Sequence, residues 1–299
     1  RYYLGTRDPK VLAEKLPMAL IHEGIGEVLV DPSGKFKSGD LVVMVPNCPV
    51  EKDDYIAENY LRSSKFCGSS MDGLLQEFVE ISSSRLVKLP QDIDRNVAAF
   101  TEIVSVSVHA ISRFDKIAHQ RRDTIAVWGD GNLGYITSLF LKYTFPKSKI
   151  VVFGTQREKL ADFTFVDETH LVNEVPDGFT MDHAFECVGG NGSPVAIEQI
   201  IGLIKPESTI SILGVSEYPV PINTRMILEK GIRMFGSSRS GVADFQKTVD
   251  MYVEHPEIID YLGNIVSSVN VVRTTSDIKA AFEKDTQKGF GKTIMKWEE

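Results

Sequence analysis

The chain has 299 residues, of which 42% are apolar and 25% are charged, a composition that is typical of globular proteins and fits one large or two medium domains. No run approaches the roughly 18 consecutive apolar residues of a membrane-spanning helix, and no apolar signal segment opens the sequence, so we expect a soluble cytoplasmic protein without membrane contact. The 33 basic and 41 acidic residues give a formal charge of -8, which argues against a nucleic-acid partner because phosphate neutralisation needs a basic face.

Short β-like runs separated by turns fill the sequence before about Val97. They are Ile25 to Val30, Asp40 to Val45, Leu74 to Ile81 and Leu86 to Pro90. Short apolar runs with Gly and Pro between them are typical of strands joined by tight turns. This part of the chain therefore predicts a small, barrel-like β domain.

From Asp123 onward, strand-like and helix-like segments alternate. The expected strands are Thr124 to Val127, Lys149 to Phe153, Met181 to Cys187, Thr209 to Leu213 and Ile232 to Phe235, with a helix at Leu133 to Tyr143. Such alternation predicts βαβ units and a doubly wound parallel sheet, so the fold class is α/β.

The last sixty or so residues change character again. Phe245 to Val253 reads as a helix, Ser268 to Arg273 as a strand, Ser276 to Lys284 as a helix and Gly291 to Trp297 as a strand. We expect this tail to return to the first domain.

A glycine-rich motif follows the strand at Thr124 to Val127 and opens the next helix. It consists of Gly129, Asp130, Gly131, Asn132, Leu133 and Gly134. The first glycine permits a tight turn, the second lets a pyrophosphate approach the backbone, and the third lets helix and strand pack closely. The motif predicts a dinucleotide on the helix N-terminus, in contact with Gly129, Gly131, Asn132, Leu133 and Gly134. Residues 105–239 are therefore expected to form a Rossmann-type domain, and residues 1–104 with 240–299 a catalytic β domain.

The strand at Ile150 to Phe153 ends at Gly154, where an NAD-binding unit normally carries Asp or Glu for the ribose hydroxyl. Here Thr155, Arg157 and Lys159 follow instead. Without a carboxylate at this strand end, a 2′-phosphate meets no repulsion there and can pair with Arg157 or Lys159. The sequence therefore favours NADP(H) over NAD(H). Two other strand ends, at Cys187 with Val188 and at Gly214, are expected to line the same crevice.

Imidazole and carboxylate groups gather at two places in the sequence. His22 and Glu23 stand just before the strand at Ile25, and Glu102 precedes a helix-like segment at Val104 to Arg113. These groups suit Zn²⁺ in a catalytic site, where an open coordination position is left for substrate.

The order of these features resembles the zinc-dependent medium-chain dehydrogenase/reductase superfamily, and Glu102 to Ala110 resembles its polyol-dehydrogenase branch. A narrower resemblance, to the ribulose-5-phosphate reductases of bacterial teichoic-acid synthesis, runs over essentially the whole chain. It is carried by Leu16 to Met18, Glu51 to Asp54, Ile56 to Tyr60, Trp128 to Thr137, His183 to Gly190 and Gly236 to Gly241.

The resemblance implies NADPH-dependent, zinc-assisted reduction of ribulose 5-phosphate to ribitol 5-phosphate. It further implies a homodimer and a cytidylyltransferase that converts the product to CDP-ribitol. His22, Glu23 and Glu102 are carried over as zinc-site residues, with Glu23 either a direct ligand or one that exchanges with water. The family's first ligand is a cysteine located before the His-Glu pair, so we expect a segment preceding Arg1 to be missing from this sequence.

The remaining expectations concern the thiols, the substrate phosphate and competing functions. Cys48 and Cys67 are expected to be ordinary thiols. Arg239, Arg7 and Lys52 are candidates for the phosphate. The alternatives are another polyol or sugar dehydrogenase, a zinc-free reductase of activated double bonds that tolerates loss of His22, and a cofactor-binding protein without turnover.

Overall fold

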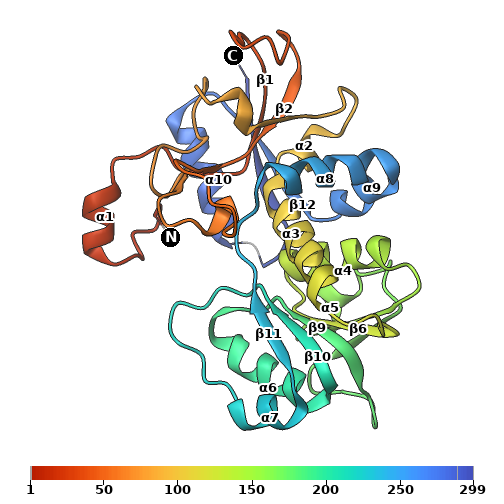
Figure 1. Ribbon diagram of the computed structural model, residues 1–299. Coiled ribbons are helices and arrows are strands. Elements are labelled where there is room, and N and C mark those ends of the chain that lie inside the picture. Colours follow the sequence, from red (N-terminus) through yellow and green to blue (C-terminus); the bar gives the residue numbers. More distant parts are fainter. Residues whose placement is uncertain (1, 288, 299) are drawn as a thin grey trace. The chain divides into compact units, whose positions relative to one another are not determined.

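The protein is described from a computed structural model in which residues 2–287 and 289–298 are placed (Figure 1). The chain divides into two compact units. The first contains Arg1–Ser105 and Arg239–Glu299, and the second contains Val106–Ser238. Across the placed residues, no helix combines the length and the apolar character needed to cross a membrane.

The second unit contains a six-stranded parallel sheet. Its strands are β6 (Thr124–Trp128), β7 (Lys149–Gly154), β8 (Glu168–Leu171), β9 (Met181–Glu186), β10 (Ile204–Ile212) and β11 (Arg233–Gly236). Their spatial order is β11-β10-β9-β6-β7-β8, with every neighbouring pair parallel. The chain therefore starts at β6, runs to one edge and then to the other, which is the doubly wound arrangement. This confirms the predicted α/β sheet.

Helices follow the strands of this sheet. They are α4 (Asn132–Thr144), α5 (Arg157–Leu160), α6 (Ser193–Leu203) and α7 (Thr224–Lys230), with a 3-10 turn, η3 (Gly190–Gly192), ahead of α6. On one face, Ala126, Trp128 and Phe153 pack with Ile197 and Ile200 of α6. Figure 1 shows α4 on the side of the sheet opposite to α6. Burial of both faces explains why β6 and β7 read as continuous apolar runs, whereas the partly exposed edge strand β8 does not and was missed in the sequence.

The first unit is built from small sheets. Its elements are α1 (Pro9–Lys15), β1 (Ile25–Glu27), β2 (Leu41–Met44), β3 (Asn47–Cys48), η1 (Glu58–Tyr60), β4 (Lys65–Phe66), η2 (Ser83–Arg85), β5 (Leu86–Lys88) and α2 (Arg95–Ala98), followed by α8 (Val242–Glu254), α9 (Glu257–Gly263), β12 (Val266–Val272), α10 (Thr275–Gln287) and β13 (Lys292–Trp297). β1, β2 and β5 form an antiparallel sheet, β3 pairs with β4, and β12 pairs with β13 in parallel. Leu41 and Val43 of β2 share a core with Phe245 and Val249 of α8, so the tail is an integral part of this unit.

Two expected elements differ in the structure. No strand forms at Leu74 to Ile81, because the amides of Leu74 and Leu75 bond to the carbonyls of Ile21 and Leu20 in an irregular loop. The helix expected from Val104 starts earlier, as α3 (Thr101–Ile117), and places Glu102 in its first turn. The side chain of Thr101 reaches back to the Ala98 carbonyl at 2.8 Å, which helps to start the helix there.

His183, in the middle of β9, predicts a pH dependence of stability. Its Nδ1 accepts a hydrogen bond from the Thr209 amide at 3.1 Å, so the neutral ring carries its proton on Nε2, which lies 3.3 Å from the His119 carbonyl. Burial, together with the neighbouring His119, lowers the pKa of His183 to about 4. The ring takes up a proton more easily in the unfolded chain than in the folded one. The stabilisation from the neutral ring is therefore complete above pH 6.5 and is lost as the pH falls towards 4, which lowers the free energy of unfolding by about 3 kcal/mol.

Urea unfolding of wild type and His183→Gln at pH 7.5 and pH 4.5 measures this effect. Gln keeps an acceptor and a donor but does not titrate in this range. We expect the free energy of unfolding of the variant to fall less between the two pH values than that of wild type. Equal losses in the two proteins would show that His183 does not cause the pH dependence.

Candidate active site

Three of the sequence-predicted residues meet in the first unit. His22, Glu23 and Glu102 each offer one donor atom, and these atoms lie within 4.8 Å of one another. His22 and Glu23 come from the loop before β1, and Glu102 comes from the first turn of α3. The His22 Nε2 and Glu102 Oε2 atoms are 3.9 Å apart. One imidazole nitrogen and two carboxylates form a donor set that suits Zn²⁺.

The hydrogen bonding of Glu23 fits a metal site. Its Oε1 accepts a hydrogen bond from the Lys292 ammonium, at the start of β13, at 2.6 Å. Its Oε2 is buried and has no hydrogen-bond partner within the placed part of the chain. A buried carboxylate oxygen without a donor is costly, and a cation bound to it removes that cost. The residues present therefore fit the ion that the sequence predicts.

The pKa shifts of Glu102 and His22 also fit a metal site. Burial and the neighbouring Glu23 raise the pKa of Glu102 to about 8, against the opposing effect of Lys292. Burial also lowers the pKa of His22, and the charges of Lys292 and Arg239 lower it further while Glu23 raises it. A neutral imidazole is the form that binds a metal, and a divalent cation stabilises both carboxylates in their charged form.

The backbone before His22 is held in an unusual conformation. Ile21 has a φ of 67°, which is a strained value for a β-branched residue. A Cβ on Gly73 would lie 2.1 Å from the Ile21 carbonyl oxygen, and one on Gly68 would lie 2.8 Å from it. The Leu74 amide donates to that same oxygen at 2.8 Å. Two glycines thus allow a close-packed loop that fixes the direction of the His22 side chain.

The three cysteines of the chain are free thiols and none of them belongs to the described metal cluster. A hydrogen bond with Cys67 lowers the pKa of Cys48 to about 7. Burial raises the pKa of Cys187 to about 12. Cys187 Sγ lies 3.7 Å from Thr137 Oγ1 of α4, at the end of β9 in the second unit.

The glycine motif adopts the geometry expected of it. Gly129 directly follows β6 and has a φ of 132°, and Gly131 is the N-cap of α4. A Cβ on Gly134 would lie 1.9 Å from the Gly129 carbonyl oxygen, so only glycine permits this close packing of helix and turn. A Cβ on Gly131 would meet nothing within 4 Å, which leaves open space for a ligand next to the backbone. Asn132 and Leu133 form the first turn of α4.

Asp130, inside the motif, is a residue whose role the sequence did not indicate. Its Oδ2 accepts hydrogen bonds from the amides of Thr155 and Gln156, at 2.6 and 2.9 Å, and from the Thr155 hydroxyl. A Cβ on Gly154 would lie 2.7 Å from the Asp130 Cβ, so the strand end must be small. Asp130 therefore orders the loop after β7 in which the adenosine ribose is expected.

The two basic candidates of this loop differ. Arg157 pairs with both carboxylate oxygens of Glu174, each at 2.5 Å, and both side chains are largely exposed. Lys159 is half-buried on α5. The expected pairing of Arg157 with a 2′-phosphate would therefore have to displace or join the Arg157–Glu174 ion pair, which the sequence pattern did not reveal.

Glu186 is a second residue whose role the sequence did not indicate. Its carboxylate links two strand ends that are expected to bind the cofactor. Its Oε1 accepts hydrogen bonds from the amides of Val188 and Gly189, at 3.1 and 2.9 Å, and its Oε2 accepts one from Gly214 at 3.2 Å. A Cβ on Gly214 would lie 2.2 Å from the Gly189 nitrogen. The buried carboxylate thus links the ends of β9 and β10. β9 lies next to β6, where the strand order reverses, and dinucleotides bind beside such a point.

Two segments of the chain match known protein families. Residues 3–91 match the alcohol dehydrogenase GroES-like domain, and residues 149–254 match the zinc-binding dehydrogenase family. A sorbitol dehydrogenase from Halalkalibacterium halodurans is 25% identical over 80% of this chain and 73% of its own length.

Higher similarity is found with reductases of a phosphorylated sugar. Ribulose-5-phosphate reductase from Bacillus spizizenii is 54% identical, over 100% of this chain and 87% of its own length. The crystal structure of TarJ from S. aureus in complex with NADPH has a TM-score of 0.89 and 47% identity, and covers 100% of this chain and 87% of that one. These similarities confirm the resemblance predicted from the sequence, and the chain belongs to the ribulose-5-phosphate reductase family of zinc-dependent medium-chain dehydrogenases.

Proposed function

We propose that the protein reduces ribulose 5-phosphate to ribitol 5-phosphate with NADPH. The C2 ketone gains a hydride and a proton and becomes a secondary alcohol, while NADPH becomes NADP⁺. The observation that carries the proposal is the cluster of His22, Glu23 and Glu102 in a chain that also has a dinucleotide-binding glycine motif. The activity named for the relatives, and the NADPH bound by S. aureus TarJ, support the choice of substrate and cofactor.

His22, Glu23 and Glu102 are the residues that would hold Zn²⁺. When bound, the ion polarises the ketone oxygen and the nicotinamide supplies the hydride. Lys292 donates to Glu23 Oε1, which leaves the buried Oε2 available to a cation. Gly129, Gly131, Asn132, Leu133 and Gly134 would hold the pyrophosphate, Gly154, Thr155, Arg157 and Lys159 the adenosine ribose and its phosphate, and Cys187, Val188 and Gly214 the nicotinamide side.

The proposal extends to the organisation of the protein. Residues 1–104 with 240–299 would form the catalytic domain, and residues 105–239 the cofactor domain. The protein would act in the cytoplasm as a homodimer and supply a cytidylyltransferase that makes CDP-ribitol for a teichoic-acid-type polymer.

Steady-state kinetics test the proposal. We expect kcat/KM to be highest for ribulose 5-phosphate with NADPH, lower with NADH, and lower for unphosphorylated ribulose and for sorbitol oxidation. Equal kcat/KM values for the phosphorylated and unphosphorylated sugars would instead support a general polyol dehydrogenase.

A further inference from the structure

Arg239, beside the candidate metal cluster, has a backbone conformation that the fold alone does not require an arginine to adopt. Arg239 lies between β11 and α8 and has a φ of 59°, a left-handed conformation that L-residues with side chains adopt at a cost in free energy. Glycine occupies such a position without that cost, and Gly236 and Gly241 stand close by in the same loop. Strained conformations of this kind gather at functional sites. A functional role of the Arg239 side chain would account for a non-glycine residue at this position.

Two aromatic contacts connect this side chain to the cluster. The Arg239 guanidinium lies over the Phe66 ring, 4.8 Å from its centroid. Phe66 also contacts His22, whose ring centroid is 5.1 Å away in an edge-on arrangement. Stacking on an aromatic face limits the directions that a guanidinium can take. Phe66 thus keeps the cation at a set place beside the imidazole of the cluster.

The backbone next to Arg239 is tied to the same helix that carries Glu102. Ser105 Oγ donates to the Glu102 carbonyl at 2.6 Å, so the hydrogen bond of 2.6 Å between Ser105 and Ser240 uses the proton of Ser240. Ser240 and Ser105 are both buried. The loop that carries Arg239 is therefore fixed to the first turns of α3, at the position of Glu102.

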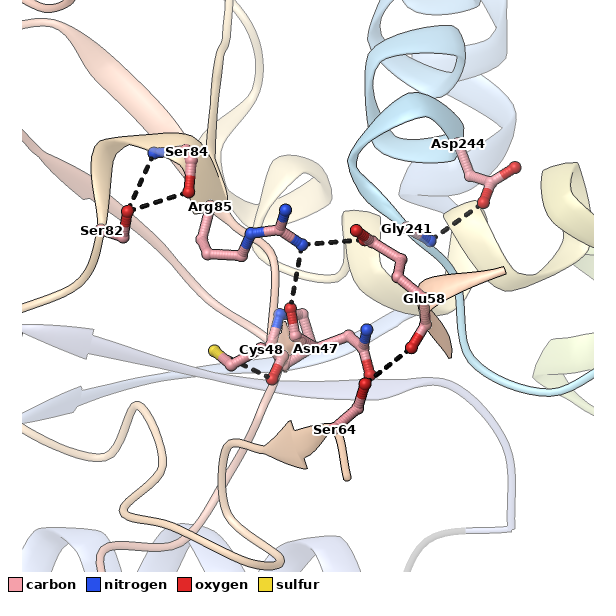
Figure 2. A network of polar contacts seen from close by, with 10 residues as sticks. Asn47, Cys48, Glu58, Ser64, Ser82, Ser84, Arg85, Gly241 and Asp244 are labelled. Carbon is pink, nitrogen blue, oxygen red and sulfur yellow. Dashed lines mark hydrogen bonds and ion pairs between the residues drawn. The ribbon is translucent and has the colours of Figure 1, made fainter. Parts of the chain in front are cut away.

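The charge of Arg239 is not neutralised. Arg239 makes no ion pair with a carboxylate of residues 2–287 or 289–298. Its neighbouring acid in the loop region is Glu58, whose carboxylate lies against Gly241 but pairs with Arg85 at 2.8 Å (Figure 2). The other cation at the cluster, Lys292, pairs with Glu23. Arg239 is thus the cation at the cluster that lacks an anionic partner in the placed part of the chain.

We propose that Arg239 binds the phosphate of the ketose substrate and makes the enzyme specific for phosphorylated sugars. The guanidinium offers paired N–H donors that match two phosphate oxygens, and the stack on Phe66 orients it before substrate arrives. The ketone at C2 would then be held at the cluster and the phosphate on C5 at Arg239, so the substrate would be fixed at two points. This inference rests on the proposed function.

The other two basic candidates lack these features. The Arg7 guanidinium lies over the ring of Tyr2, 5.0 Å from its centroid, and is exposed near α1. Lys52 is exposed in the loop after β3. Arg239, by contrast, lies over Phe66, which contacts His22 of the cluster.

Kinetics with ribulose 5-phosphate and ribulose test the role of Arg239. We expect Arg239→Gln to lower the ratio of the two kcat/KM values, phosphorylated over unphosphorylated, about 10- to 100-fold, mainly through KM for ribulose 5-phosphate. Arg239→Gly removes the backbone strain together with the cation, so it should show the same lower ratio with an unchanged or higher Tm. Arg225→Ala, which removes an exposed arginine of α7, is the matched control and should leave the ratio as in wild type.

The outcomes separate this inference from the proposed function. A wild-type enzyme without preference for the phosphorylated sugar contradicts the proposed function itself. A wild-type preference that Arg239→Gln and Arg239→Gly both retain overturns the role of Arg239 and leaves the function intact. Equal losses on both sugars, with lower zinc content, also overturn it, because they assign Arg239 to the structure of the metal site.

Discussion

His22→Ala should abolish zinc binding and lower kcat/KM for ribulose 5-phosphate by at least about 1000-fold, because the polarisation of the ketone oxygen is lost with the ion. His22 contributes the imidazole of the cluster, and the remaining carboxylates of Glu23 and Glu102 would then face each other with Lys292 as their nearby cation. Elemental analysis of the purified variant measures the zinc, and NADPH oxidation measures the rate.

Two controls accompany His22→Ala: the NADPH affinity of the variant, and a second variant that removes another histidine. NADPH affinity, measured by fluorescence titration, should stay within about 2-fold of wild type because the glycine motif belongs to the second unit. His255→Ala removes a partly exposed histidine at the end of α8 and should keep both zinc and activity. Full turnover of ribulose 5-phosphate by a zinc-free His22→Ala variant would show that the reaction does not depend on this metal site.

Gly134→Ala should weaken NADPH binding by at least about 10-fold and lower the stability of the second unit, since overpacking in a tight contact forces the backbone to shift. The added Cβ would lie 1.9 Å from the Gly129 carbonyl oxygen, so helix α4 and the turn after β6 have to separate. Zinc content should remain that of wild type. Fluorescence titration of NADPH and thermal unfolding measure the two effects.

Gly131→Ala is the matched variant, because its Cβ would meet no protein atom within 4 Å. Its Tm should therefore stay close to that of wild type while its affinity for NADPH falls, since the new methyl group occupies the space that the pyrophosphate needs. If Gly131→Ala binds NADPH as wild type does, the pyrophosphate lies elsewhere and the role given to this motif is wrong.

The parts of the fold that were predicted correctly have a strong local signal. β6 and β7 are almost fully buried, so each appears as an apolar run, and Gly134 reflects a backbone contact with Gly129 that no other residue allows. The edge strand β8, with the sequence Glu-Thr-His-Leu, is only partly buried and carries no such run, so the sequence did not predict it. The run at Leu74 to Ile81 carries the same apolar signal without forming a strand. Its backbone hydrogen bonds go to the Leu20 and Ile21 loop, a partner that sequence distance conceals.

The residues of the candidate site could likewise be predicted only where their own residue type carries the signal. His22, Glu23 and Glu102 were predicted because their residue types are those of a metal site. Asp130 and Glu186 were not, because their importance lies in accepting backbone amides from loops about 25 residues away, and a single acidic residue carries no sign of such a partner. The strain at Ile21 depends on Gly68 and Gly73, which only the folded chain brings together.

Removal and return of zinc test the central claim most directly. The enzyme is stripped with a chelator, and NADPH oxidation with ribulose 5-phosphate is followed as zinc is added back. We expect negligible activity in the stripped enzyme and a rise in activity that ends at about one zinc per candidate site, as for a single catalytic ion. Full activity of the stripped enzyme, with no zinc detected by elemental analysis, would contradict the central claim.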